Sequence, residues 1–224
     1  DRLGVEDLEG LKRAIADGSL AKLPGMGEKK VENIRRGIET RERAAERISV
    51  RDAALVADEV VAYLSGAPGI GRVSAAGSLR RMKETVGDID VLASGKDGAA
   101  IVRHFVRHPG TVRVLAEGET KSSIIVRAGG LERQVDLRVV DASEYGAALL
   151  YFTGSKAHNI KLRGLAKDRG LKISEYGVFR GAKKLAGREE EDCYRVLGMP
   201  WVPPEMREDR GEVELALAGR LPRL

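Results

Sequence analysis

The sequence predicts an α+β fold in which a mixed or antiparallel sheet is flanked by helical segments. Three observations predict it. Residues 1–47 carry no strand pattern, and their apolar residues recur at helical spacing. Between residues 72 and 140, short runs alternate apolar with polar residues, as half-buried strands do. From Glu144 onward the helical period returns.

The helical start is expected to contain one helix over Val5–Ala16, a glycine-rich loop and a charged helix from Glu28 onward. A further helix over Val50–Leu64 places Val56, Val60 and Leu64 on one face. It stops at the helix-breaking run Ser65–Gly69, where the pattern changes to strands.

The middle of the chain is expected to form a sheet, interrupted by one helix over Gly98–Arg107. Gly129-Gly130 indicates a hairpin between the last two strands. The expected strands are Arg72–Ala76, Asp88–Ala93, Thr111–Ala116, Ser122–Arg127 and Leu131–Val140. Helical spacing then runs to Ala166, followed by a mixed stretch over Leu171–Phe179 and a polar, linker-like tail after Trp201.

Composition narrows the class of protein. The 224 residues hold 42% apolar residues, and 39 basic against 34 acidic side chains leave a net charge of +5, which excludes a disordered chain and makes a polyanionic partner plausible. One cysteine excludes a disulfide framework, and three scattered histidines exclude a histidine-based metal site. No apolar run is long enough to span a membrane, and the single cysteine favours a reducing compartment, so we expect a cytoplasmic protein.

Three aspartates carry the sharpest chemical signal. Asp88 and Asp90 alternate with Ile89 and Val91, so both carboxylates project from one face of a strand. Asp136 lies on the polar face of a neighbouring alternating segment and could supply a third carboxylate. Convergent carboxylates are the ligands that Mg²⁺ prefers, and a pair of such ions serves phosphoryl transfer.

An Asp-x-Asp pair can also lie on a solvent-exposed strand face without binding a metal, and the spacing alone favours that interpretation. The context favours a site. Gly77-Ser78 and the basic pair Arg80-Arg81 lie just upstream, where backbone N–H groups, a hydroxyl and two guanidinium groups could receive phosphate oxygens.

These residues resemble those of a family X DNA polymerase of the bacterial type. The likeness rests on GS-x-RR-x5-GDID from Gly77, on RQVDLR around Asp136, and on YFTGSKAHNIKLR from Tyr151. It implies a polymerase-β-like nucleotidyltransferase palm, with a helix-hairpin-helix or fingers segment over 1–47, the palm over 48–143, and a mainly helical thumb with a C-terminal linker over 144–224. It also implies a core fragment that lacks the family's N-terminal lyase and C-terminal phosphoesterase domains.

The resemblance implies a function as well. A monomer would fill gaps in DNA repair by joining a deoxynucleoside triphosphate (dNTP) to the primer 3′-hydroxyl of gapped or primer-template DNA. Asp88 and Asp90 would bind two Mg²⁺ ions, for which Mn²⁺ can substitute, and Asp136 would bind the ion that activates the hydroxyl. The positions that match nucleotide-binding residues are Arg47, Gly77, Ser78, Arg81, Gly87, Tyr151, Phe152, Gly154, Lys156 and Asn159.

Two of those matches have plainer interpretations, since Arg47 could be a solvated arginine and Phe152 a core residue. Arg163, four residues after Asn159 on the same helix face, matches a contact to the template strand. The helix from Lys156 to Gly170 carries a local charge of +4, which beside a nucleotide site favours contact with DNA.

The segment LPGMGEKKVEN from Leu23 resembles a helix-hairpin-helix, which binds a DNA phosphate without reading bases. Gly25 and Gly27 would form its turn, and Lys29 and Lys30 would add positive charge. Relatives that remove a sugar phosphate carry a Schiff-base lysine where this sequence has Asn33. An amide cannot form the imine, so we expect no lyase activity from this hairpin.

Two departures from the family pattern concern the site. Gln134 stands where relatives commonly have an arginine, which removes a positive charge near the primer end. Lys156 occupies a position that often lacks one, and we expect it to strengthen binding of the triphosphate before DNA arrives. Two other functions remain open, namely a template-independent nucleotidyltransferase and a DNA-end-binding scaffold without synthesis.

Overall fold

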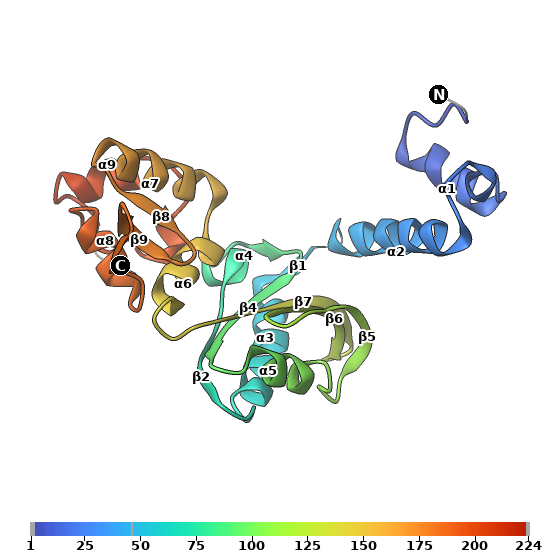
Figure 1. The fold of residues 1–224 in the computed structure, drawn as a ribbon, viewed down its shortest axis with the longest axis horizontal. Coiled ribbons are helices and arrows are strands. Elements are labelled where there is room, and N and C mark those ends of the chain that lie inside the picture. The colour runs from blue at the N-terminus through green and yellow to red at the C-terminus, as the bar shows by residue number, and fades with distance from the viewer. Residues whose placement is uncertain (1–2, 46, 223–224) are drawn as a thin grey trace. The chain divides into compact units, whose positions relative to one another are not determined.

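The computed structural model describes residues 3–45 and 47–222. The chain forms two compact units that divide between residues 46 and 47 (Figure 1), and each is described by itself. Within the described residues, none of the helices combines the length and the hydropathy needed to cross a membrane.

The N-terminal unit is helical, as predicted. Asp7 caps its first helix by accepting a hydrogen bond from the backbone N–H of Gly10, at 2.6 Å. A tight turn, in which the N–H of Met26 donates to the carbonyl of Leu23 at 3.0 Å, leads into the last helix. Gly25 in this turn has a φ of +78°, which favours glycine. The elements are α1 (Leu8–Ala16), the short 3₁₀ helix η1 (Leu20–Lys22) and α2 (Glu28–Ala45).

The second unit contains the predicted mixed sheet. Five strands lie in the order β2-β4-β7-β6-β5, with β4 and β7 parallel and the other neighbours antiparallel. The hairpin between β6 and β7 turns at Gly129-Gly130, as predicted. The strands are β2 (Ile70–Ala75), β4 (Ile89–Gly95), β5 (Thr111–Glu117), β6 (Lys121–Ala128) and β7 (Leu131–Val140).

Two helices pack on one face of this sheet, and the hydrophobic core lies between these helices and the strands. Helix α3 (Val50–Leu64) begins at Ser49, whose side chain accepts from the N–H of Asp52, and α5 (Gly98–Phe105) begins after Asp97. Both pack against alternate residues of β4 and β7, among them Ile89, Val91, Val135 and Leu137. The three remaining elements of this part are the paired strands β1 (Ile48–Ser49) and β3 (Thr85–Val86) and the short helix α4 (Gly77–Arg80).

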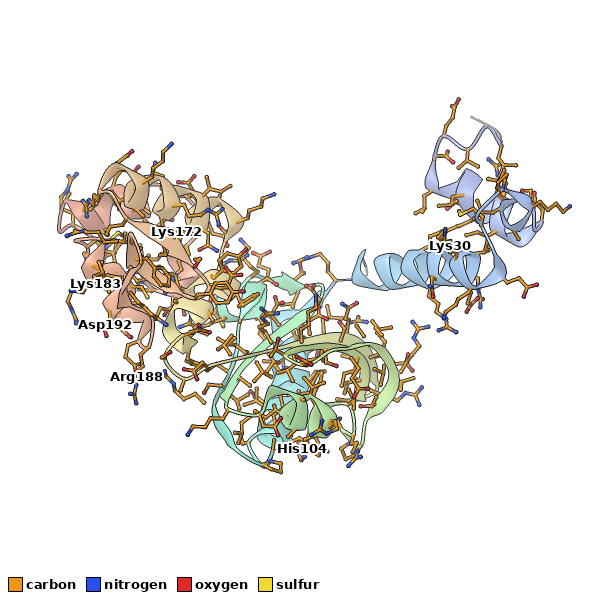
Figure 2. The ribbon with its side chains drawn as sticks, viewed as in Figure 1. Lys30, His104, Lys172, Lys183, Arg188 and Asp192 are labelled. Atoms are coloured by element: carbon orange, nitrogen blue, oxygen red, sulfur yellow. The ribbon has the colours of Figure 1, made fainter. Side chains whose placement is uncertain are left out.

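The chain after Val140 has a core of its own, built around Leu162, Tyr194 and Leu197. A small cluster joins it to the sheet, because Tyr145 and Ala148 pack on Leu92 and Val140 from the face opposite α3. Polar side chains such as the labelled Lys172, Lys183 and Arg188 point outward from this region (Figure 2). Its elements are α6 (Tyr145–Thr153), α7 (Lys156–Asp168), β8 (Lys172–Ser174), β9 (Gly177–Arg180), β10 (Lys183–Ala186), α8 (Glu190–Val196), η2 (Pro204–Met206) and α9 (Glu212–Leu217).

Two expectations for this region need correction. The helical stretch from Glu144 to Ala166 is broken into α6 and α7 at Gly154, whose φ of +71° lies outside the helical range. The stretch after Trp201 is no linker up to Leu217, since Val202, Val213 and Ala216 are buried in the core. Its many charged residues suggested a solvated tail, but the structure also buries Arg207 and Glu212 in this stretch against polar partners.

Candidate active site

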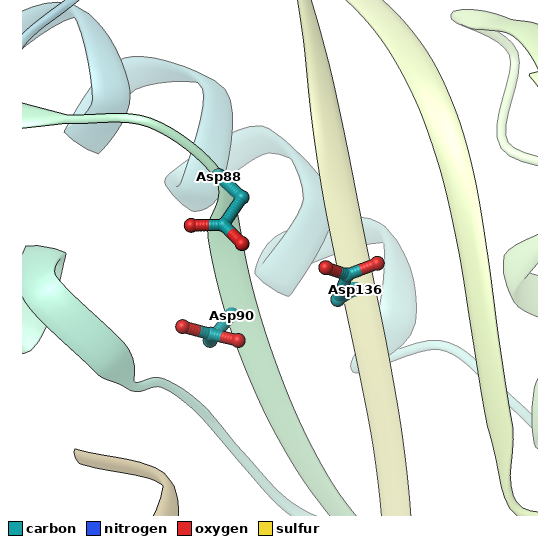
Figure 3. Close-up of side chains that lie close together, drawn as sticks. All are labelled: Asp88, Asp90 and Asp136. Carbon is teal, nitrogen blue, oxygen red and sulfur yellow. The ribbon is translucent and has the colours of Figure 1, made fainter. Parts of the chain in front are cut away.

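Parallel pairing of β4 and β7 brings the three aspartates together. Asp90 lies directly opposite Asp136 in the register, and Asp88 immediately precedes β4. One carboxylate oxygen from each lies within 4.8 Å of the others, and Figure 3 shows the three side chains around one space. The convergence expected from the spacing is therefore present in the structure.

This crowding raises the pKa of two of the carboxyl groups. Burial and then the charges of Asp88 and Asp136 raise the pKa of Asp90 to about 7. Burial raises the pKa of Asp136 to about 6, although a hydrogen bond from Gln134 acts in the opposite direction. Carboxylates this close together repel one another when they are ionised. Such a cluster fits a site in which a divalent cation supplies the compensating positive charge.

Gly77 packs against this triad and has no room for a side chain. A Cβ built on Gly77 would lie 2.0 Å from Oδ2 of Asp90, and its φ of +57° disfavours any other residue. Gly77 is thus required by the position of the Asp90 carboxylate.

We expect Gly77→Ala to lower the rate of nucleotide incorporation by about a hundredfold, because the methyl group displaces the Asp90 carboxylate by about an ångström. Single-turnover primer extension measures this loss. Gly164→Ala is the matched control, since an added Cβ there meets no atom within 4 Å. Equal rates for the two variants would contradict the prediction.

One cleft beside the triad gathers most of the predicted nucleotide-binding residues. Gly87 is buried between β3 and β4, next to Asp88, and is not among the residues that line the cleft. Lys83 and Thr153 also line it, although neither was predicted as a site residue. The complete lining is Arg47, Gly77, Ser78, Arg81, Lys83, Asp88, Asp90, Tyr151, Phe152, Thr153, Gly154, Lys156, Asn159 and Arg163.

Arg47 and Arg81, two of the three arginines that line the cleft, already donate hydrogen bonds within the protein. Arg47, which is exposed, donates from Nε to the Thr85 hydroxyl at 2.8 Å and from Nη2 to the Thr85 carbonyl. Arg81 donates from Nε to Glu208 at 2.9 Å and from Nη1 to the carbonyl of Thr153 at 2.5 Å. Both guanidinium groups are therefore held at the cleft in defined orientations.

Tyr151 and Phe152 form an aromatic wall of the cleft. The rings of Tyr151 and Phe152 meet edge to face, with 5.2 Å between their centroids. Tyr151 is 37% exposed, whereas Phe152 packs partly buried against the cluster around Leu92, so it has a core contact as well as a cleft face. Asn159 donates to the backbone carbonyl of Tyr151 at 2.7 Å and so ties the start of α7 to this wall.

Gln134 takes the place of the missing arginine beside Asp136. Its Nε2 donates to both carboxylate oxygens of Asp136, at 3.1 and 3.0 Å. A neutral amide therefore holds the third carboxylate, and it adds no positive charge beside Asp136.

Part of the positive charge on α7 is compensated. Lys161 pairs with Glu214 at 2.5 Å, so its charge is directed toward α9. Lys156, the first residue of α7, and Arg163 are exposed and line the cleft.

The predicted hairpin residues lie in the N-terminal unit. Gly25, Gly27, Lys29 and Lys30 are exposed at the turn and at the start of α2. Lys30 folds back to donate to the carbonyl of Gly25 at 2.8 Å, which stabilises the turn.

A buried ionic network that was not predicted is linked to the cleft, because Arg80 donates both to Glu190 and to the hydroxyl of Thr153. Glu190, 4% exposed, accepts hydrogen bonds from Arg80, from Arg207 and from the Trp201 indole. Burial opposes the charge on Glu190, yet the hydrogen bonds from Arg80 and Arg207 outweigh it and lower its pKa to about 2. No local sequence pattern predicts this network, because Arg80 and Glu190 are 110 residues apart in the chain.

Comparison with known proteins agrees with this geometry. Residues 148–208 match the family model of the DNA polymerase beta thumb, and residues 1–40 match that of the SAM-like helix-hairpin-helix tandem. DNA polymerase/3′-5′ exonuclease PolX of Bacillus subtilis is 38% identical over 214 residues, which cover 95% of this chain and 37% of that protein. The chain belongs to the family X DNA polymerases.

Other family X polymerases match over shorter stretches. DNA polymerase lambda of Rattus norvegicus is 34% identical over 161 residues, covering 60% of this chain and 28% of that protein. The chain thus spans about a third of the length of these curated relatives.

The fold is shared with solved polymerase structures. A crystal structure of Leishmania infantum polymerase beta in a ternary primer/template complex superposes with a TM-score of 0.74 at 23% identity, covering 93% of this chain and 90% of that one. The ternary gap complex of the same polymerase gives a TM-score of 0.73, also at 23% identity, over 90% of this chain and 83% of that one. The polymerase-beta-like fold of this family X chain follows from these matches.

Proposed function

We propose that this chain is a template-directed DNA polymerase that fills gaps during DNA repair, acting as a cytoplasmic monomer. The observation that carries the proposal is the convergence of Asp88, Asp90 and Asp136. Asp88 and Asp90 line a cleft that also presents Arg81, Lys83 and Lys156, and Asp136 lines the adjoining pocket that shares Asp90 with it. The carboxylates can bind divalent cations, and the arginine and lysine side chains can bind a triphosphate. The site therefore offers ligands for both the metal ions and the nucleotide that nucleotidyl transfer requires.

The carboxylates would hold two Mg²⁺ ions, which supply a Lewis acid for the attacking and leaving oxygens. Ser78 and Arg81 lie at the start and just after the end of α4 and offer a hydroxyl and a guanidinium for the β- and γ-phosphates. Arg47 and the backbone at Gly87 stay proposed contributors. Such contacts hold the triphosphate in line with the primer hydroxyl and offset its charge.

The aromatic wall would receive the nucleoside. Tyr151 and Phe152 would pack against the sugar and disfavour a ribose 2′-hydroxyl. Asn159 and Arg163, one turn apart on α7, would reach the incoming base and the template strand. Because Asn159 already bonds the Tyr151 carbonyl, a nucleotide contact by its amide has to be made beside or in exchange for that bond.

We infer that each of three segments has its own role. Residues 48–143 form the palm, residues 144–224 form the thumb, and residues 1–47 form a DNA-binding hairpin segment. The N-terminal match to a helix-hairpin-helix supports the last role. Gly25 and Gly27 shape the turn, and Lys29 adds exposed charge for a DNA phosphate.

Primer extension tests the function. On one-nucleotide gapped DNA with Mg²⁺, the wild-type chain should insert the nucleotide complementary to the template, and Asp136→Ala should not. Addition to a single-stranded primer without a template would favour the template-independent transferase. DNA binding without any synthesis would favour the scaffold.

The exposed Lys156 at the cleft leads to a separate prediction about the DNA-free chain. Lys156→Asp should weaken binding of a deoxynucleoside triphosphate by roughly tenfold, because an attractive charge becomes a repulsive one near the phosphates. Equilibrium titration measures the affinity. Lys167→Asp, the same charge change farther along α7, should leave it unchanged, and equal affinities for both variants would remove Lys156 from the site.

A further inference from the structure

Glu208 places a negative charge among the cations of the cleft. Its Oε1 lies 2.9 Å from Nε of Arg81 and 3.5 Å from Nζ of Lys83. Both cations line the cleft with Asp88 and Asp90. In the nucleotide-free chain, the Glu208 carboxylate therefore binds the same two cations that a triphosphate would contact.

The backbone of Glu208 is fixed while its side chain is free to leave. The preceding Arg207 is fully buried, donates to Glu190 at 2.7 Å, and offers its carbonyl to the N–H of Ser155 at 3.0 Å. The Glu208 N–H donates to the carbonyl of Met206 at 2.9 Å. Its side chain is 22% exposed, so rotation about its own bonds can bring the carboxylate into water without moving this segment.

Arg81 also has donors to spare. Nε serves Glu208 and one N–H of Nη1 serves the Thr153 carbonyl, which leaves further N–H groups of the five that a guanidinium carries. The Thr153 contact keeps Arg81 at the cleft when Glu208 departs. Arg81 therefore does not depend on Glu208 for its orientation.

We propose that Glu208 is an internal competitor for the triphosphate, which holds Arg81 and Lys83 in the nucleotide-free chain and is exchanged for phosphate oxygens when a nucleotide binds. Glu208 is then a determinant of nucleotide affinity. The inference rests on the proposed function, since it takes Arg81 and Lys83 as cations that meet the phosphates. Burial acts to raise the pKa of Glu208, but the hydrogen bond from Arg81 and the charges of Arg81 and Lys83 outweigh it and hold the pKa below its ordinary value. The carboxylate is therefore an anion that has to be displaced.

Equilibrium titration of the DNA-free chain tests this, with a deoxynucleoside triphosphate and Mg²⁺, and with inorganic tripolyphosphate as a second probe that lacks base and sugar. Glu208→Gln and Glu208→Ala should both bind the two probes roughly three- to tenfold more tightly, the scale of a partly buried ion pair. Glu205→Gln, an exposed residue three positions earlier, makes the same charge change and should bind as the wild type does.

The outcomes separate the inference from the function on which it rests. If the wild type binds and Glu208→Ala binds equally or more weakly, Glu208 orients Arg81 or is a bystander, and the competition is refuted. Tightening of equal size in Glu205→Gln would also refute it, because only net charge would matter. If no variant and no wild-type chain binds either probe, the proposed function itself fails. Thermal unfolding of each variant verifies that it is folded.

Discussion

Asp136→Ala is expected to reduce template-directed extension by at least about a thousandfold, which corresponds to about 4 kcal/mol of lost transition-state stabilisation. Asp136 is one of three carboxylates that converge in one cluster, and it is the member that comes from β7. Its removal takes away the carboxylate proposed to serve the primer hydroxyl, whereas the cations proposed to bind the triphosphate remain. The rate of the chemical step should therefore fall much more than nucleotide affinity.

Single-turnover kinetics with a saturating triphosphate measure the rate, and equilibrium titration measures the affinity. Asp136→Asn keeps the size and the contact to Gln134 while removing the charge, so it should lose almost as much rate as the alanine variant. Asp141→Ala is the matched control, because Asp141 lies on an exposed turn just after β7. A variant at Asp136 that keeps more than a tenth of the wild-type rate would show that the chemistry does not need this group.

Glu190→Ala is expected to lower the free energy of unfolding by about 3–5 kcal/mol, because it leaves buried guanidinium charge without a partner. Arg207 has no exposed surface and Arg80 is mostly buried, so water cannot replace the lost carboxylate. The neighbouring Glu189 offers a matched control. Glu189 is 46% exposed and pairs with Arg72 at the surface, so Glu189→Ala should cost under about 1 kcal/mol.

Urea unfolding followed by far-ultraviolet circular dichroism measures both losses, provided that the slope against urea is unchanged. The pH dependence has a defined sign. Because the folded pKa of Glu190, about 2, lies below its ordinary value of 4.5, its contribution is present above about pH 4.5 and is lost as the pH falls toward 2. A loss in Glu190→Ala no larger than that in Glu189→Ala would mean that the network contributes no stability.

Local pattern was enough for most of the fold. Alternation placed β7 at Leu131–Val140 and the breaker run ended α3 at Leu64, as the structure has them. Glycine positions fixed the hairpin at Gly129-Gly130, since both residues have positive φ. Strand β10 and helix α9 were missed, because their short charged sequences resemble solvated loops until a core is available to bury one face.

The same distinction, between local sequence pattern and contacts made by distant segments, applies to the residues of the candidate site. Asp88, Asp90 and Asp136 could be proposed from spacing, because alternation dictates which face of a strand a side chain takes. Lys83, Glu208 and Glu190 could not, because their importance comes from partners more than a hundred residues away in sequence or from a different part of the fold.

By itself the sequence determined the alternation of helices and strands, the acidic motif and the family resemblance, because these depend on residues close together in the chain. The tertiary structure alone decided that β4 and β7 lie side by side in parallel, and hence that Asp90 faces Asp136. It also decided which arginine meets which glutamate. Those pairings depend on how distant segments pack, and a charged residue looks the same in sequence whether its partner is water or a buried side chain.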